Sequence, residues 1–389
     1  MKLDFNNVDF VQPHYKSVIA INARRFATAF NVADIAHLSP LGPKIDPYYT
    51  KTVIIRNPRL VSGHNKFQIG ISNMNESIKI MNDEPCSAES LDYMCSELGA
   101  KSIDMSEFNV DNLESASHLF CNCFKLEHVR LGKLSNGTMK SINAMFKECR
   151  SIVELSIYTL DTSAVVNMSK MLYNCYSLKK AILHSFDTRY VTDMSSMFFG
   201  CKNLLRLNLS HFETPNLEFM GQMFCGCKKL KKVNISGFNT SKVIDMHWLF
   251  NDCRSIRELD LSNFDTSNVR NMDQLFRWCS SLSKLNIASF DTSKVENMKC
   301  MFQNCTSLKE LDLSHFNMKK VCRAHKMFQG CESLEKLNLS GWDLSSIKTT
   351  ENMFKDCSKL REVILPLEPK SRDIIYKQLL QDKISCKII

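Results

Sequence analysis

Cysteine is the residue type that offers this chain the most chemistry, because thiols can form disulfides, bind zinc or attack substrates. The sequence has 389 residues and 17 cysteines. Ten of them recur every 26 residues without an insertion: Cys123, Cys149, Cys175, Cys201, Cys227, Cys253, Cys279, Cys305, Cys331 and Cys357. The other seven share no period: Cys86, Cys95, Cys121, Cys225, Cys300, Cys322 and Cys386. So strict a period indicates a stacked repeat.

Metal binding is the first chemistry to weigh. Cys121 with Cys123, and Cys225 with Cys227, are CxC pairs, but no CxxC or HxxxH motif accompanies them. His211 and His315 occupy equivalent positions four turns apart. Strands stacked at roughly 4.8 Å would separate them by about 19 Å, too far to share one ion. We therefore expect no metal and no other cofactor.

The periodic cysteines are also poor candidates for catalysis or disulfides. A nucleophilic thiol needs a lowered pKa beside a basic partner, whereas these stand between Phe and Leu residues. Stacked helical faces lie roughly 8 to 10 Å apart, beyond the roughly 7 Å between Cα atoms that a disulfide allows. We interpret them as small buried thiols in a reducing compartment. Since GxGxxG, Walker and GxSxG motifs are absent from the sequence, we expect no enzyme.

The elements that hold these cysteines are best seen in the turn that follows Cys227. Leu230, Val233 and Ile235 come three, six and eight residues later, and Phe238 comes at eleven. This alternation predicts a short strand. Further on, apolar residues step by three and four, which predicts a helical face; they are Val243, Met246, Leu249, Phe250, Cys253 and Ile256. Each turn is thus predicted to be strand, corner and helix.

A Thr-Ser pair precedes each predicted helical segment, for example Thr240 and Ser241. We expect its hydroxyl groups to cap the helix, and the Asp or Asn before it to form the corner. One turn offers about eight apolar side chains, each worth roughly 1.5 to 3 kcal/mol when buried. That is too little to order 26 residues at roughly 1.5 kcal/mol each. Neighbouring turns must therefore cover each other, and the array needs caps.

The predicted organisation has three parts. Residues 1–96 form an N-terminal cap or small α/β domain, and residues 97–365 form an α/β solenoid of about ten turns. Residues 366–389 contain a C-terminal capping helix over residues 372–381. Within the N-terminal part, the pattern predicts strands at residues 53–55 and 67–71 and a helix over residues 87–99.

The repeat carries a family resemblance. Its core, MFxxCxSLxxLxLSxFxTSxVxxM, resembles the leucine-rich repeats of BspA-like bacterial surface proteins, especially the mycoplasma-lipoprotein type. The resemblance spans roughly residues 97–365 and is clearest in MFQNCTSLKELDLSHF, MFQGCESLEKLNLSGW and LFNDCRSIRELDLSNF. It implies a curved or rod-like leucine-rich-repeat solenoid that binds proteins, often as an adhesin or cell-surface antigen.

The start of the chain bears on its compartment. Residues 1–16, MKLDFNNVDFVQPHYK, hold acids and a proline where a signal peptide needs an apolar run. The Arg24-Arg25 pair resembles the start of a twin-arginine export signal, but Asn31 and Asp34 interrupt the apolar stretch behind it. No segment reaches the roughly 20 apolar residues of a membrane span. We expect a cytoplasmic protein; the alternative is a protein at the cell surface, or secreted by a non-classical route.

Partner binding is expected on the predicted strands. The residues five and seven positions after each cysteine should point outward and form two polar columns. The candidates are Arg206, Asn208, Lys232, Asn234, Glu258, Asp260, Lys284, Asn286, Glu310, Asp312, Lys336 and Asn338. One reading is a concave recognition surface whose mixed charges match a partner. The other is that the Asn and Asp side chains only hydrogen-bond along the stack and keep the sheet soluble.

The net charge of +9 raises the question of nucleic acid. Only Lys228, Lys229, Lys231 and Lys232 form a dense group, and acids interleave elsewhere, so we do not expect a nucleic-acid partner. The predicted function is a non-catalytic protein-protein interaction module whose strand face binds a protein partner. The alternatives are an adhesin or exported effector that binds host or cell-surface proteins, and an enzyme hidden in residues 1–96.

Overall fold

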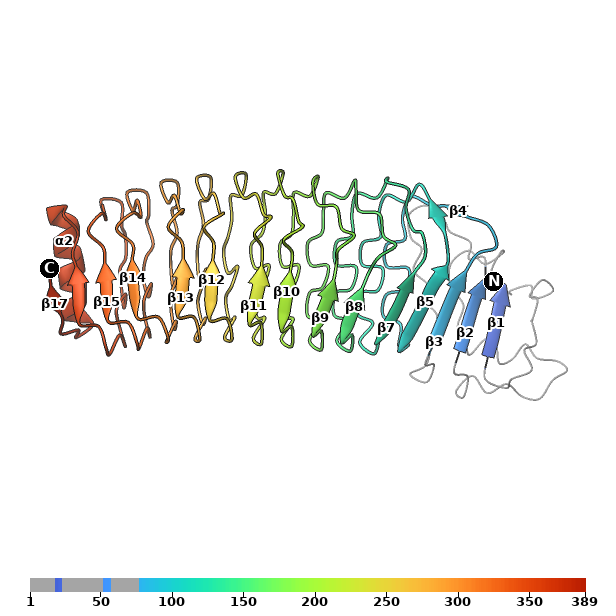
Figure 1. Cartoon of the computed structure of the whole chain (residues 1–389), viewed down its shortest axis with the longest axis horizontal. Helices are drawn as coiled ribbons and strands as arrows, with labels where there is room; N and C mark the ends of the chain where they lie inside the picture. The colour runs from blue at the N-terminus through green and yellow to red at the C-terminus, as the bar shows by residue number, and fades with distance from the viewer. Residues whose placement is uncertain (1–17, 23–51, 57–76) are drawn as a thin grey trace, which may run out of the picture. The chain divides into compact units, whose positions relative to one another are not determined.

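The computed structural model describes residues 18–22, 52–56 and 77–389. It comprises two compact units, Met1–Thr188 and Arg189–Ile389. Each unit is a stack of turns, and successive turns contribute parallel strands to one face (Figure 1). The predicted solenoid is therefore confirmed.

The first unit contains a five-stranded parallel sheet. Its members are β1 (Val18–Asn22), β2 (Thr52–Arg56), β3 (Ser77–Met81), β5 (Ser102–Glu107) and β7 (His128–Leu131). A separate two-stranded sheet joins β8 (Glu154–Ser156) to β9 (Lys180–Ile182), and β4 (Cys86–Ser87) pairs with β6 (Val110–Asp111).

The predictions for the N-terminal part are confirmed only in part. Strand β2 contains the predicted strand 53–55, whereas the predicted strand 67–71 lies outside the described residues. The predicted helix over residues 87–99 is wrong, because this segment forms turns. Because Ser77 of β3 pairs with Ser102 of β5, one sheet spans the boundary predicted at residue 96. A separate N-terminal domain remains a prediction.

The second unit has strands of three residues in successive turns. Strand β10 (Arg206–Asn208) pairs with β11 (Lys232–Asn234), and β12 (Glu258–Asp260) pairs with β13 (Lys284–Asn286). The last sheet contains β14 (Glu310–Asp312), β15 (Lys336–Asn338), β16 (Glu362–Ile364) and β17 (Lys387–Ile388). In Figure 1, β10 and β11 form one pair and β12 and β13 another, while the strands of the last sheet follow one another.

The predicted helical segment of each turn is wrong. On this side of the stack the amide hydrogen bonds alternate between two targets. Met197 N donates to Met194 O within its own turn (3.2 Å), while Phe198 N donates to Met223 O of the next turn (2.9 Å). Two residues per turn have left-handed backbone angles, as at Ser196 (φ 57°) and Gly200 (φ 71°), and these angles are incompatible with a continuous right-handed α-helix. The spacing by three and four therefore marks burial rather than an α-helix.

The Thr-Ser pairs have a different role from the predicted cap. The Thr240 hydroxyl donates to Asp265 O of the next turn (2.9 Å), so it joins turns instead of starting a helix. Thr266 makes the equivalent bond to Asp291 O (2.8 Å). The predicted corner is confirmed, because Ser241 N donates to the Asn239 side chain (3.0 Å).

The core consists of the predicted apolar columns. Phe250 is fully buried and stacks between Phe224 and Phe276, with ring centroids 5.3 and 6.1 Å away. The periodic cysteines are buried, as predicted, and all 17 cysteines are free thiols. The Cys253 thiol also donates to Phe224 O of the preceding turn (3.1 Å), a contact that recurs along the column.

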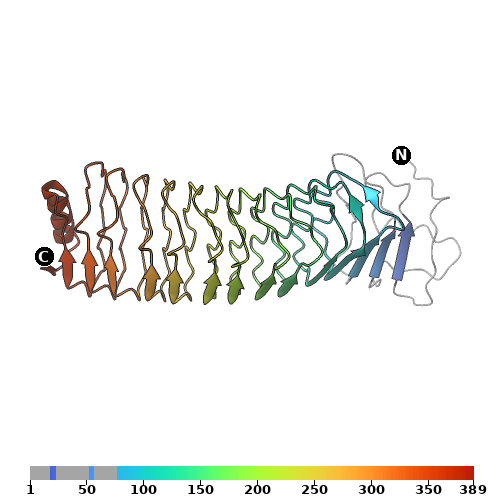
Figure 2. The same ribbon diagram turned by 45° about the horizontal axis from the view of Figure 1, so that its top comes forward.

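Helix α2 (Pro369–Gln381) covers the C-terminal end of the second unit and includes the predicted helix (Figure 2). The Glu368 carboxylate caps it by accepting from Lys370 N and Ser371 N (3.0 and 2.6 Å). Phe354 N of the last turn donates to the Asp382 carboxylate (2.8 Å), which takes the place of a carbonyl from a further turn. Strand β17 then pairs with β16.

Candidate interaction surface

The twelve predicted site residues all lie at the ends of strands β10 to β15. In each strand they flank an aliphatic side chain that faces the core, as Arg206 and Asn208 flank Leu207. Ten of the twelve are exposed, while Asn234 and Asn338 are half-buried. The two predicted polar columns therefore exist on the strand face.

The Asn and Asp column has a structural role. The Asn208 side chain accepts from Ser210 N (3.2 Å), and the Asp312 side chain accepts from Ser314 N (2.9 Å). The same bond closes the other four strands of the set. Asn286 also donates to the Asp260 carboxylate across the strand pair (2.9 Å). Six of these bonds close the turn that follows the same strand, and the bond from Asn286 to Asp260 runs along the stack, so the contacts favour a structural role for this column over partner contact.

The charged column differs from one strand pair to the next. Lys284 lies opposite Glu258 and forms an ion pair at 2.8 Å, and Lys336 lies 3.7 Å from Glu310. The hydrogen bond from Lys284 lowers the pKa of Glu258. Arg206, however, lies opposite Lys232, a pair of like charges. Charge is therefore matched within β12 to β15 and unmatched on β10 and β11.

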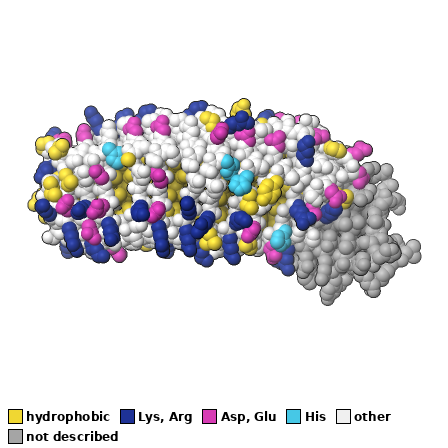
Figure 3. Space-filling view, in the orientation of Figure 1, with side chains coloured by type: hydrophobic (Ala, Val, Ile, Leu, Met, Phe, Trp, Pro, Cys, Tyr) yellow, Lys and Arg dark blue, Asp and Glu magenta, His cyan; other side chains and the backbone are white. Residues whose placement is uncertain are grey.

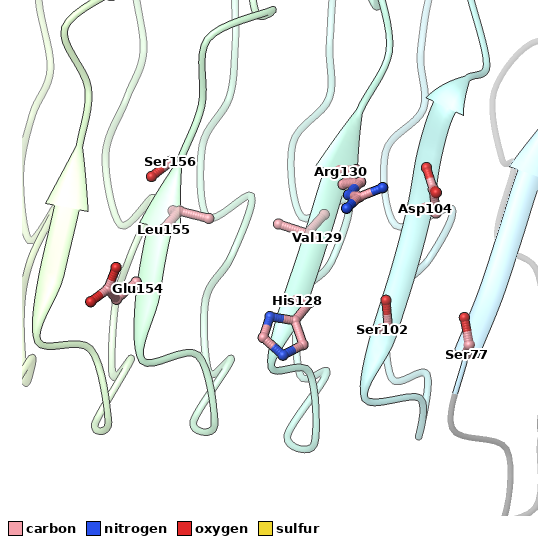
Figure 4. A pocket seen from close by; sticks show the side chains of 9 residues that line it. All are labelled: Ser77, Ser102, Asp104, His128, Val129, Arg130, Glu154, Leu155 and Ser156. Carbon is pink, nitrogen blue, oxygen red and sulfur yellow. The ribbon is translucent and has the colours of Figure 1, made fainter.

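A hollow of about 610 Å³ opens on the strand face of the first unit. Strands β3, β5, β7 and β8 line it (Figure 4). Its lining residues are Ser77, Ser102, Asp104, His128, Val129, Arg130, Glu154, Leu155 and Ser156. The hollow lies where the five-stranded sheet ends at β7 and the β8–β9 sheet begins. It is therefore a break in the strand face lined by side chains of both charges.

Asp104 is held as a carboxylate in this hollow. Burial alone would raise its pKa, but hydrogen bonds from the Ser106 hydroxyl (2.6 Å) and amide (2.9 Å) outweigh it. The positive charges of Arg130 and Lys79 act in the same direction, so the pKa of Asp104 is lowered. Figure 4 shows Arg130 projecting from β7 beside Asp104 of β5. The hollow thus presents a fixed negative charge beside a guanidinium group.

The sequence pattern contains a signal for these residues that the prediction missed. His128 and Arg130 stand five and seven positions after Cys123, and Glu154 and Ser156 stand at the same offsets after Cys149. They belong to the same two columns, which begin earlier than Arg206. The offsets identify outward side chains but do not reveal a break in strand pairing.

Other chemistry finds little support in the part of the chain that the structure describes. It contains no group of three or more His, Cys, Asp and Glu side chains able to hold a metal. Burial raises the pKa of both Cys123 and Cys225 to about 12, which makes each thiol a poor nucleophile. His211 and His315 pack edge-on against Phe212 and Phe316. Within the described residues, no helix is both long and apolar enough to cross a membrane.

Comparison with known proteins gives one family and several solved structures. The model of the family described as "Mycoplasma protein of unknown function, DUF285" matches residues 48–152, 140–259 and 244–365. No curated protein matches the sequence.

Three solved bacterial structures are similar over most of their length. A leucine-rich repeat protein from Bacteroides ovatus has 19% identity, with 100% of this chain and 99% of that chain covered and a TM-score of 0.41. A leucine rich cell surface protein from Faecalibacterium prausnitzii has 14% identity, coverages of 93% and 94% and a TM-score of 0.38. A leucine-rich repeat protein from Eubacterium ventriosum has 13% identity, coverages of 81% and 90% and a TM-score of 0.38.

Proposed function

The chain belongs to the DUF285 family, and we propose that it is a non-catalytic recognition module that binds a protein partner through its strand face. The observation that carries this proposal is the hollow between β3 and β8. There, outward side chains from four strands converge around a break in the sheet.

The chemistry of the hollow suits the polar surface of a protein. The Arg130 guanidinium can donate two parallel hydrogen bonds to a carboxylate, and the Asp104 carboxylate can accept from a Lys, an Arg or an amide. Three serine hydroxyl groups, at Ser77, Ser102 and Ser156, add donors and acceptors. Groups of both charges at fixed positions select a partner with the complementary pattern.

The predicted columns contribute unequally to this proposal. The charges on β12 to β15 form exposed ion pairs that neutralise each other, so they keep the surface soluble and contribute little binding energy. Arg206 and Lys232 have no such match, and we assign them to partner contact. The other ten predicted residues pair with each other or hydrogen-bond within the stack, so we do not assign them to partner contact.

The test is affinity capture from the native cell lysate and surface fraction. Wild type is compared with a double variant, Asp104→Arg with Arg130→Asp, which inverts the charges of the hollow without changing the net charge. The matched control, Glu258→Lys with Lys284→Glu, inverts an ion pair on β12 and β13. We expect one protein to be captured by wild type and control and reduced at least about tenfold in the hollow variant.

A third variant guards against misfolding. Asp104 also closes a turn with Ser106, so Arg130→Gln is included because it removes one charge and leaves that turn intact. Thermal unfolding must show that all three variants are folded. If all folded variants capture the same proteins as wild type, the hollow is not the binding site and the proposal fails.

We further propose a reducing compartment, with the cytoplasm as the simplest one. The supporting observation is that 17 cysteines are free thiols, ten of them in the repeated core column. Fractionation of the native cells tests it. Recovery of the protein at the cell surface or in the medium would favour the adhesin alternative instead.

A further inference from the structure

A dense group of cations lies on the second unit, at the edge where its strands begin. Segments 202–206, 228–232 and 254–258, here called the basic patch, contain eight Lys or Arg residues and one Glu. The equivalent segments of the next three turns, 280–284, 306–310 and 332–336, contain three Lys and three Glu. In Figure 3, Lys and Arg side chains run along the length of this edge. The excess of cations is therefore larger in these three turns than in the three turns that follow them.

Acidic neighbours neutralise only part of the basic patch. Asp252 pairs with Lys228 (3.3 Å) and Arg254 (2.5 Å), and Glu258 pairs with Lys284. Lys202 also has an interaction partner. The other five cations are exposed and have no ion pair among the residues that the structure describes: Arg206, Lys229, Lys231, Lys232 and Arg257. The folded chain therefore carries a concentrated positive charge at the basic patch that its own acidic side chains do not neutralise.

The strand register shows that this excess of cations destabilises the pairing of β10 with β11. Arg206 lies directly opposite Lys232, where like charges repel. At the same position the neighbouring pairs place Glu258 opposite Lys284 and Glu310 opposite Lys336. A partner that carries negative charge would remove the repulsion between Arg206 and Lys232.

The backbone holds these cations at regular intervals. Lys229 N donates to Lys202 O (3.2 Å), and Lys231 N donates to Leu205 O (2.9 Å). Strands stack at roughly 4.8 Å, so the three turns span about 10 Å. This is close to the Debye length at physiological salt, about 8 Å, so the cations act together as one field.

We propose that the basic patch binds an acidic segment of the protein partner. This inference rests on the proposed function and names the chemistry of its partner. A protein segment fits better than a nucleic acid, because single-stranded nucleic acids are bound by aromatic side chains that stack on the bases. The three segments contain no aromatic residue, and the neighbouring Trp278 ring already has the Arg254 guanidinium over it, 5.4 Å from the ring centroid. Carboxylates of the partner would lie over Arg206 and Lys232.

The test measures binding of fluorescein-labelled octaglutamate to the full chain by fluorescence anisotropy. Labelled octalysine and a single-stranded oligonucleotide serve as comparison probes. The test variant is Arg206→Glu with Lys232→Glu. The control is Lys309→Glu with Lys336→Glu, which makes the same change in net charge on the balanced turns. Both variants alter exposed side chains, and thermal unfolding confirms that each is folded.

The expected result is binding of octaglutamate by wild type, weakening as salt rises from about 50 to about 300 mM. The Arg206/Lys232 variant should lose at least about tenfold in affinity and the Lys309/Lys336 variant less than about twofold. The proposal is overturned by equal losses in both variants, by no binding, or by tighter binding of the oligonucleotide that the test variant abolishes.

The two proposals fail in different ways. If the hollow variant loses its captured protein while octaglutamate does not distinguish the two patch variants, the proposed function stands and the acidic segment is wrong. If octaglutamate requires Arg206 and Lys232 but no captured protein depends on the strand face, the patch stands and the proposed function fails.

Discussion

At the scale of single residues, the periodic cysteine combines two properties that the core needs. It is small and apolar enough to lie between turns, and its thiol can donate a weak hydrogen bond. Cys253 donates to Phe224 O (3.1 Å), and Cys279 donates to Phe250 O (3.2 Å). Alanine would lose the donor, and serine would place a more polar group in the core. The cysteine period thus follows from packing rather than from reactivity.

These thiols predict a loss of stability at alkaline pH. Burial raises the pKa of Cys123 and of Cys357 to about 12, and it raises the pKa of Cys253 well above the ordinary value. Below the unfolded thiol pKa, about 8.5, both states hold the proton and stability is complete. Above it only the unfolded chain ionises, so each buried thiol should cost about 1.4 kcal/mol per pH unit until the folded pKa is reached.

Urea unfolding between about pH 7.5 and about pH 10.5 measures this slope. A variant with Cys123→Ser and Cys357→Ser should show a slope shallower by about 2.7 kcal/mol per pH unit, because two titrating groups are removed. Equal slopes in wild type and variant would contradict the assignment of the effect to these thiols.

Phe250 provides a second prediction at this scale. Its ring is fully buried between two other rings, so Phe250→Ala should lower the free energy of unfolding by about 3 to 5 kcal/mol. The control is Phe219→Ala, because the Phe219 side chain is 38% exposed and its loss should cost less than about 1 kcal/mol. Chemical denaturation of both variants checks the difference, and similar costs would show that the Phe250 column is not the core.

At the scale of elements, the sequence pattern predicts strands well and the remainder of each turn poorly. Strands β10 to β15 lie where aliphatic residues alternate, because the two-residue period is specific to strands. Spacing by three and four reports only a buried side. It cannot show that Phe198 N bonds to the next turn at Met223 O. The available signal is the residue before each cysteine, as at Asn174, Gly200, Gly226 and Asn304, where left-handed geometry favours Gly and Asn.

The same limit applies to the candidate site. The outward column positions can be predicted from a single offset, because side chains alternate across a strand. The hollow extends from β3 to β8 and includes the place where pairing stops between β7 and β8. That break is a property of neighbouring turns together, and no single turn of the sequence records it.

The C-terminal cap makes a testable contribution through one carboxylate. Asp382→Ala leaves Phe354 N without its acceptor, and a buried amide without a partner costs about 1 to 3 kcal/mol. The control on the same helix is Asp373→Ala. Asp373 makes only an exposed pair with Lys377, worth less than about 0.5 kcal/mol. Hydrogen exchange over residues 344–357 should accelerate in the first variant only; acceleration in both would mean that the whole helix, not Asp382, protects the turn.

At the scale of the whole molecule, a uniform fold carries an uneven distribution of charge. Within the second unit, Glu lies opposite Lys in the β12–β13 and β14–β15 pairs, whereas Arg206 lies opposite Lys232 in the β10–β11 pair. Within the first unit, the hollow interrupts an otherwise regular strand face. Because packing fixes the buried column positions in every turn, outward positions are free to vary from turn to turn. Such variation allows a repeat array to acquire specificity without changing its core.

A repeat array also tolerates the removal of whole turns, because each turn contacts only its neighbours. Deletion of residues 254–305 removes the β12–β13 pair and brings Cys253 directly before Thr306. In the intact chain Phe250 N donates to Leu275 O, and Phe302 N donates to Met327 O. The deletion removes Leu275 and Phe302, so Phe250 N would donate to Met327 O instead. Lys232 would stand beside Glu310, much as it now precedes Glu258. The shortened chain should fold and unfold cooperatively.

The expected loss of unfolding free energy for this deletion is about 3 to 8 kcal/mol, from roughly 0.05 to 0.15 kcal/mol for each residue removed. The control deletes residues 254–302, three residues fewer, and displaces every later apolar column by three positions. It should not yield a folded protein, because Phe and Cys side chains would leave the core positions. Circular dichroism and gel filtration of the two proteins distinguish these outcomes. If the out-of-register deletion folds as well as the deletion of two full turns, column packing does not hold the solenoid together.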